Sequence, residues 1–211
     1  MYSCQSSAAV YGAAMNRSDF RARGTGGANK TVWLLQWAKS RSEKNLYGIP
    51  IPNFGKVVDT IYRGALPDAE GYRALAEKLG VLRVCSIIEH ESREDRDRAL
   101  GAGIKEWRHI PFSDRHGPSP VGVRQWLNYI RTSETDGPIF THCRGGRHRT
   151  GMLVGVYRVA DCGWTKEEAY IEMKTYGWYS AMGHQPLINW FFHDFNPRDY
   201  RADSQLSEDE A

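Results

Sequence analysis

A single cysteine is surrounded by basic side chains in the stretch THCRGGRHRTG, residues 141–151. The basic residues that follow Cys143 within six positions are Arg144, Arg147, His148 and Arg149. A thiol among cations loses its proton more readily than an isolated thiol, and the thiolate is the reactive nucleophile. These residue types therefore predict a nucleophilic Cys143 in a site that binds an anion.

The glycine pair Gly145 and Gly146 predicts the shape of that site. The apolar run at residues 138–142 indicates a buried strand, and the pattern of residues 150–162 indicates a helix. Between them, two glycines allow a tight turn whose N–H groups point inward. Such a turn at a helix N-terminus binds a tetrahedral dianion, and Arg149 adds a planar fork that matches two phosphate oxygens. The sequence thus predicts a phosphate-binding loop.

The elements that must position this loop alternate between strand and helix along the chain. We predict strands at residues 57–66, 81–88, 104–111 and 138–142, and helices at residues 68–79, 92–100, 120–132, 150–162, 165–177 and 187–195. Alternation at this spacing is typical of parallel βαβ units. We therefore expect an α/β fold, a three-layer αβα sandwich with a central, mostly parallel sheet. Loops at the carboxyl ends of such strands share one edge, where ligands usually bind.

Composition limits the size and the class of the protein. A chain of 211 residues with 41% apolar composition can bury one good core. We expect one domain at residues 51–197, a flexible lead-in at residues 1–50 with a short helix at residues 30–39, and an acidic tail at residues 198–211. The net charge of +3 is too small to indicate a nucleic-acid partner.

Targeting signals are not visible in the sequence. No apolar run approaches the roughly 20 residues of a transmembrane helix. The start of the chain carries no signal-peptide pattern. This favours a cytoplasmic protein, unless the given start is a trimmed one, in which case we would expect an exported protein.

With these features in place, the residues resemble a known family. The stretch from His142 to Gly151 fits the pattern HC-x5-R-[ST]-G, the signature loop of the cysteine-dependent protein tyrosine and dual-specificity phosphatases. Two further segments, NFGKVVDTIYRGALP at residues 53–67 and LGVLRVCSIIEHESRE at residues 79–94, resemble atypical dual-specificity members from bacteria, plants and fungi. The resemblance implies a protein tyrosine phosphatase-like fold and makes residues 51–197 a phosphatase domain.

Four catalytic roles follow from this resemblance. Cys143 would attack phosphorus and form a cysteinyl-phosphate that water then hydrolyses. Arg149 and the loop amides would hold the phosphoryl oxygens. Thr150 would donate a hydrogen bond to the sulfur, and His142 would lie behind the loop and help to fix the thiolate. The substrate-binding residues would be Arg144, Gly145, Gly146, Arg147 and His148. No metal or other cofactor is implied, since the arginine and the amides do the electrostatic work that a cation would otherwise do. His142, Cys143 and His148 are poor candidates for metal ligands, because adjacent residues at one strand end cannot easily share a tetrahedral site.

A general acid must also protonate the leaving oxygen. We assign this role to Asp114, which follows a predicted strand end and therefore lies at the same edge of the sheet as the loop. Asp136 is closer in sequence, but it lies at the far end of its strand, about 16 Å away at the usual strand rise. Glu89 and Glu91 reach the correct edge from another loop and remain alternatives.

Three further residues stay open on sequence alone. Arg63 either faces the site or braces a loop. Cys85 lies in a strand that should neighbour the strand of Cys143, so it either forms a protective disulfide with Cys143 under oxidation or fills the core as a small apolar residue. His184 lies just before the last predicted helix and is a candidate for the pocket.

The expected substrate is a phosphorylated protein, with phosphotyrosine as the main target and phosphoserine or phosphothreonine as further ones. Arg144, Arg147 and His148 exceed what one phosphate needs, and related members with a basic GKHRTG loop act on inositol pyrophosphates. The alternative is therefore an inositol polyphosphate or phosphoinositide. A module that binds a phosphorylated ligand without catalysis is the third hypothesis. The sequence does not indicate an oligomeric state.

Overall fold

The structure is a computed structural model that describes residues 47–179 and 183–201. The strands are β1 (Gly55–Val58), β2 (Ile61–Ala65), β3 (Arg83–Ser86), β4 (Glu106–His109) and β5 (Ile139–Cys143). The helices are α3 (Ala69–Leu79), α4 (Arg93–Gly101), α5 (Pro120–Arg131), α6 (His148–Ala160), α7 (Lys166–Thr175) and α8 (Gln185–Asn189). The helix predicted at residues 30–39 and most of the predicted acidic tail lie outside the described residues.

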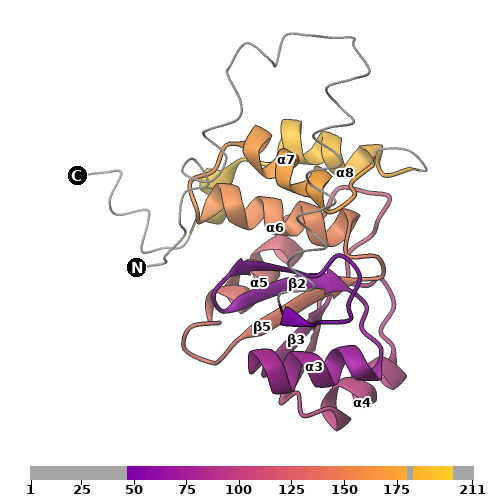
Figure 1. Cartoon of the computed structure of the whole chain (residues 1–211). Helices are drawn as coiled ribbons and strands as arrows, with labels where there is room; N and C mark the ends of the chain where they lie inside the picture. The colour runs from indigo at the N-terminus through magenta and orange to yellow at the C-terminus, as the bar shows by residue number, and fades with distance from the viewer. Residues whose placement is uncertain (1–46, 180–182, 202–211) are drawn as a thin grey trace, which may run out of the picture.

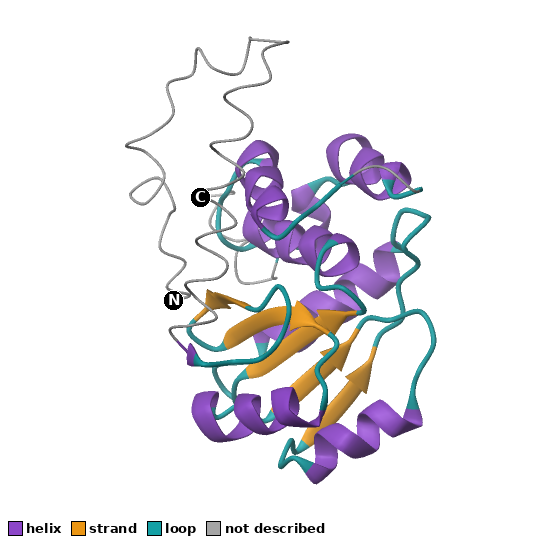
Figure 2. Ribbon diagram, turned by 45° about the vertical axis from the view of Figure 1, so that its right-hand side comes forward, coloured by secondary structure: helices purple, strands orange, loops and turns teal. Residues whose placement is uncertain are grey.

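The strands described here form one sheet in the order β1-β2-β5-β3-β4. Strands β2, β5, β3 and β4 run parallel, whereas β1 pairs antiparallel with β2 at one edge. Helices α3 and α4 cover one face of the sheet, and α5 and α6 cover the other, with α7 and α8 packed against α6 (Figures 1 and 2). The predicted three-layer α/β fold with a mostly parallel sheet is confirmed.

Apolar side chains fill the spaces on both sides of the sheet. Trp126 and Leu153 belong to the cluster between the sheet and α5–α6, and Leu75 and Phe140 belong to the cluster beneath α3; all four are fully buried. Strand β5 lies between the two clusters, and each of its residues is buried. The residue that ends this strand is therefore held by a rigid support. In the described part of the chain, no helix is long and apolar enough to span a membrane.

The single strand predicted at residues 57–66 is wrong. The chain reverses at Asp59 and Thr60, so two antiparallel strands, β1 and β2, occupy this region. The turn contains neither glycine nor proline, the residues that usually mark a reversal, and the run therefore resembles one strand. The reversal brings the segment before β1 beside the end of β2, where the backbone N–H of Ala65 donates to the carbonyl of Pro52 over 2.8 Å.

Local sequence signals at the helix ends are confirmed. The Asp68 side chain accepts a hydrogen bond from the backbone of Gly71 at the start of α3, and Gly80 ends that helix with a φ of 62°. Thr165 and Glu168 form the predicted capping box of α7. Each signal depends on residues three or four positions apart, which is why sequence alone locates these ends.

The last helical segment differs from the helix predicted at residues 187–195. Helix α8 spans only Gln185–Asn189, and a π-helical turn at Trp190–Asp194 follows it. A short 3-10 helix at Pro197–Tyr200 then packs on α5 and α6 and buries Tyr200. The packed chain therefore continues beyond residue 197, where we expected the tail to begin.

Candidate active site

Cys143 is the last residue of β5 and opens the loop that leads into α6. The residue is 3% exposed. Its backbone N–H donates a hydrogen bond to the hydroxyl oxygen of Thr150 over 2.9 Å. Because that oxygen accepts from the backbone, the hydroxyl proton is left for another acceptor, and its donation to the sulfur of Cys143 stays a prediction.

Three consecutive carbonyls of the loop, those of residues 144–146, are hydrogen-bonded from behind. The donors are the backbone N–H of Leu66 to Arg144 (3.2 Å), Nδ2 of Asn53 to Gly145 (2.7 Å) and Nη2 of Arg63 to Gly146 (2.8 Å). In a trans peptide the N–H points away from the carbonyl. These contacts therefore turn the loop N–H groups toward the front of the loop, where they form a nest that binds anions.

Gly146 is needed both for its conformation and for its contacts. Its φ is 65°, in the left-handed region that residues other than glycine rarely adopt. A Cβ at this position would lie 2.4 Å from the backbone carbon of Gly64, so the loop rests directly on β2. At Gly145, by contrast, a Cβ would meet nothing within 4 Å. The predicted glycine pair therefore has one member that the fold requires and one that faces open space.

Arg149 is buried in the first turn of α6, which begins two residues earlier than predicted, at His148. Its Nη1 donates to the carbonyl of Phe112 over 3.2 Å, and its Nη2 lies 3.9 Å from Oδ2 of Asp114. Both contacts are with the loop that follows β4. The guanidinium therefore links the phosphate-binding loop to the segment that carries the predicted general acid.

Asp114 lies at the edge of the sheet that was predicted for it. Its side chain is 36% exposed and forms the ion pair with Arg149. Its backbone carbonyl lies 3.1 Å from Nδ1 of His184, the residue before α8. Sequence alone suggested His184 for the pocket, and the structure places its ring beside the backbone of the Asp114 loop.

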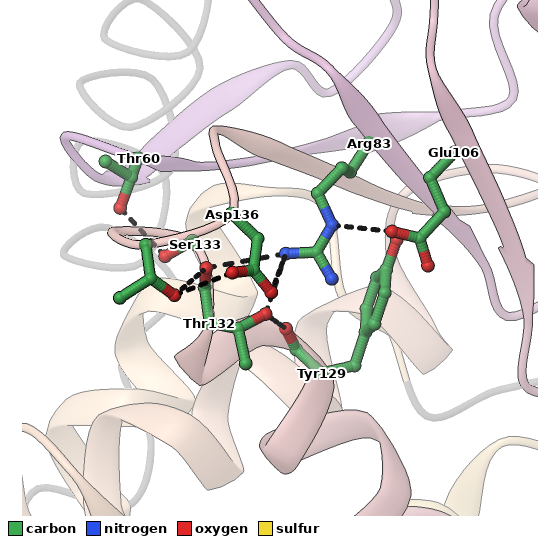
Figure 3. Close-up of polar contacts among 8 residues, drawn as sticks. Thr60, Arg83, Glu106, Tyr129, Thr132, Ser133 and Asp136 are labelled. Carbon is green, nitrogen blue, oxygen red and sulfur yellow. Dashed lines mark hydrogen bonds and ion pairs between the residues drawn. The ribbon is translucent and has the colours of Figure 1, made fainter.

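The competing carboxylates are less well placed. Asp136 lies at the opposite edge of the sheet, where Oδ2 is 3.7 Å from Nη1 of Arg83 (Figure 3). Glu89 and Glu91 are exposed. Among the described residues, neither glutamate forms an ion pair with Arg149. The geometry therefore favours Asp114 as the acid.

His142 lies behind the loop, as expected, but it is neutral. It is fully buried and packs against the rings of Phe140, Trp107 and Tyr72. Burial lowers the pKa of His142 to about 3, against a smaller opposing effect of the Cys143 backbone. Its ring therefore supports the strand end without supplying a positive charge to the thiolate.

The three surplus basic residues of the loop divide into two groups. Arg144 and Arg147 are exposed at the rim. His148, in contrast, is not exposed with them. It is 9% exposed, stacks on His184 with ring centroids 3.6 Å apart, and meets the edge of Trp178. Burial, and next the charge of His184, lower the pKa of His148 to about 4, so its neutral ring adds no positive charge to the rim.

Cys85 and Cys143 are both free and buried thiols. Cys85 pairs in register with Thr141, two residues before Cys143 on the neighbouring strand. Strand spacing and rise place the two Cα atoms about 8 Å apart, beyond the roughly 4.4–6.8 Å that a disulfide spans. A bond between them would require the backbone to move, and Cys85 occupies the core as a small apolar residue.

Clusters that could hold a metal ion, meaning three or more His, Cys, Asp or Glu side chains, are not found among residues 47–179 and 183–201. What the loop offers an anion is a nest of backbone N–H groups, one buried arginine and a thiol. A profile of the tyrosine phosphatase family matches residues 48–207. The chain belongs to this family. The resemblance drawn from the signature loop is thereby confirmed.

Two curated relatives illustrate the range of the family. The dual specificity protein phosphatase TpbA of Pseudomonas aeruginosa is 35% identical over 130 residues, which cover 61% of this chain and 56% of TpbA. The inositol diphosphatase SIW14 of Saccharomyces cerevisiae is 32% identical over 114 residues, covering 52% of this chain and 40% of SIW14. The chain therefore spans about half the length of the curated relatives it matches.

A solved structure of TpbA in complex with pTyr shares the fold. It superimposes with a TM-score of 0.59 and 24% sequence identity, and the match covers 76% of this chain and 92% of the TpbA chain. The likeness supports the arrangement of layers and strands.

The sequence did not assign two residues to the support of the loop. Asn53 holds the Gly145 carbonyl, and Arg63, whose orientation was left open, holds the Gly146 carbonyl. The signal for Arg63 was its place in YRG, within a segment that resembles the family. Asn53 begins the same segment, but its contact with Gly145 depends on the β1–β2 reversal, which the sequence does not mark.

Proposed function

We propose that this protein is a cysteine-dependent phosphatase. The observation that carries the proposal is the loop itself, in which N–H groups turned forward surround the end of β5 at Cys143. In the first step a bond forms between sulfur and phosphorus as the bond from phosphorus to the leaving oxygen breaks, and Asp114 gives that oxygen a proton. Arg149 and the loop N–H groups stabilise the charge that develops on the equatorial oxygens.

The second step releases phosphate. Water attacks phosphorus, Asp114 accepts the proton from this water, and the bond between phosphorus and sulfur breaks to restore the thiolate. No oxidant or external reactant other than water is needed. Asp114 thus acts as acid and then as base, and Arg149 acts in both steps.

For the substrate, we propose phosphotyrosine in proteins, with phosphoserine and phosphothreonine as further targets. TpbA is named a dual specificity protein phosphatase, and its structure was solved with pTyr bound. The alternative is an inositol polyphosphate. Exposed Arg144 and Arg147 at the rim favour it, and SIW14 is named an inositol diphosphatase.

The test compares a phosphotyrosine peptide with inositol polyphosphates, including an inositol pyrophosphate, as substrates of the purified protein. We expect turnover of the peptide and its loss in Cys143→Ser, with phosphate binding retained. Turnover that survives in Cys143→Ser would contradict the mechanism. Turnover of the inositol compounds alone would contradict the protein substrate.

A rim variant separates the two substrates further. The double variant Arg144→Ala, Arg147→Ala should lose little activity on p-nitrophenyl phosphate, which carries a single phosphate. It should lose at least about tenfold on an inositol polyphosphate if the rim binds additional phosphates. Arg96→Ala, an exposed arginine on α4, is the matched control for loss of surface charge.

A further inference from the structure

Arg63 is a fully buried arginine directly behind the phosphate-binding loop. It lies in β2 and is 1% exposed. Its Nη2 donates to the Gly146 carbonyl over 2.8 Å, and its guanidinium lies over the ring of Tyr176, 3.8 Å from the centroid. The same Nη2 would be 3.7 Å from a Cβ at Gly151, in the first turn of α6. A positive charge is therefore held beside the positive end of a helix dipole.

Within residues 47–179 and 183–201, no carboxylate forms an ion pair with this charge. Glu172 on α7 acts electrostatically on Arg63, but its two oxygens are engaged by Arg158, at 2.8 Å from Nη2 and 3.3 Å from Nε. In the described part of the chain, Nε and Nη1 of Arg63 have no hydrogen-bond partner. Burial lowers the pKa of Arg63, and Cys143 is among the acidic groups that oppose this effect.

Arg83 shows what a compensated buried arginine looks like in the same sheet (Figure 3). Its side chain is 7% exposed and also lies over a tyrosine ring, that of Tyr129. However, its Nε is 2.9 Å from Oε2 of Glu106, and its Nη1 is 3.7 Å from Oδ2 of Asp136 and donates to Thr132. An unpaired buried charge is costly, so the contrast indicates that Arg63 has another partner.

We propose that Arg63 is a positioning residue of the active site that fixes the loop through the Gly146 carbonyl, and that the anion of the site, the Cys143 thiolate or a bound phosphate, is the partner of its charge. The proposal rests on the phosphatase function proposed above. It adds a second arginine, on β2, to the one in the signature loop.

Other charged or titratable groups also face the site. They are Arg149 from α6, Asp114 from the loop after β4, His142 and Cys85 from the neighbouring positions of the sheet, and the rim residues Arg144 and Arg147. His142 is neutral, and a carboxyl group carries no positive charge in either protonation state, so neither His142 nor Asp114 supplies positive charge to the thiolate. Arg149 is unchanged in every variant described below, so a difference between the Arg63 variants and the wild type reports on Arg63.

The experiment measures the rate of alkylation of Cys143 by iodoacetamide as a function of pH, together with the binding of inorganic phosphate. In Arg63→Met, we expect the pH midpoint of alkylation to rise by about one unit, because a nearby opposite charge commonly changes such midpoints by one to three units. Phosphate binding should weaken by about tenfold. Arg83→Met, the matched control, should keep the wild-type midpoint even if its melting temperature falls.

Two further variants separate charge from hydrogen bonding and serve if Arg63→Met does not fold. Arg63→Lys keeps the charge and should keep a midpoint near that of the wild type. Arg63→Gln keeps a donor for the Gly146 carbonyl without the charge and should show the raised midpoint. Equal midpoints in the Lys and Gln variants, or an equal rise in Arg83→Met, would overturn the proposal.

Neither measurement requires a substrate. If the midpoint responds to Arg63 but no phosphorylated compound is turned over, the proposed function fails and this inference stands. If turnover is observed and the midpoint does not respond, the inference fails and the function stands.

Discussion

Asp114 is held to the site at two points, by the ion pair of its side chain with Arg149 and by the contact of its carbonyl with His184. One contact aims the carboxyl group, and the other fixes the backbone that carries it. The residue that we propose as the proton donor is thus positioned by one arginine from α6 and one ring from the segment before α8. A single side-chain change can therefore separate its chemistry from its location.

Asp114→Asn keeps the size of the side chain and removes the proton that the leaving oxygen needs. We expect turnover of phosphate esters with poor leaving groups, such as phenyl phosphate, to fall by about 10²- to 10⁴-fold. Turnover of p-nitrophenyl phosphate should fall much less, because its phenolate leaves without a proton. Steady-state kinetics on both esters measure this, with Glu89→Gln as the control that should be unaffected. Equal losses on the two esters would count against Asp114.

At the scale of the element, the loop and the β1–β2 pair form one unit. The loop rests on Gly64 of β2, and its carbonyls are held by donors from residues 53, 63 and 66. The geometry of the catalytic loop therefore depends on a hairpin that lies about 80 residues or more away in sequence.

The glycine pair allows a direct test of this dependence. Gly146→Ala should lower the free energy of unfolding by about 2 kcal/mol or more. An alanine there is strained by the left-handed backbone conformation, and its Cβ would lie 2.4 Å from the backbone carbon of Gly64. Gly145→Ala should change it by no more than about 0.5 kcal/mol. Urea unfolding followed by fluorescence measures both. Similar losses in the two variants would contradict the close packing of the loop on β2.

The same contrast shows how far sequence alone could reach. The signature loop, the helix caps and the βαβ alternation depend on residues close together in the chain, and these predictions are confirmed. The burial of His148 could not be predicted from the local sequence, because its ring packs against Trp178 and His184, which come from segments some 30 residues further on. Asn53 was missed for the same reason, since its partner Gly145 lies 92 residues away.

For the whole molecule, buried histidines make stability depend on pH. Burial lowers the pKa of His142 to about 3 and that of His148 to about 4, whereas an unfolded histidine titrates near pH 6.5. Between these values the unfolded state binds more protons than the folded state. Stability therefore decreases as the pH falls from about 6.5 toward 4, and it is restored as the pH rises.

This dependence should appear in thermal unfolding measured between pH 7.5 and pH 4.5. The wild type should lose melting temperature across this range, and His148→Phe, which keeps an aromatic ring in place, should lose less. Carboxylates contribute to acid sensitivity in both proteins, so the difference between the two curves isolates His148. Parallel curves would show that His148 is not held neutral in the folded protein.

The three hydrogen bonds behind the loop have a consequence for how the protein binds its substrates. They come from the protein itself, so the loop needs no ligand to reach its binding shape, and little conformational entropy is lost when an anion arrives. Every phosphorylated compound therefore binds to the same rigid loop, which we call the cradle. Discrimination among substrates must then arise outside it, from the depth of the opening and from Arg144 and Arg147, which can change without disturbing the cradle.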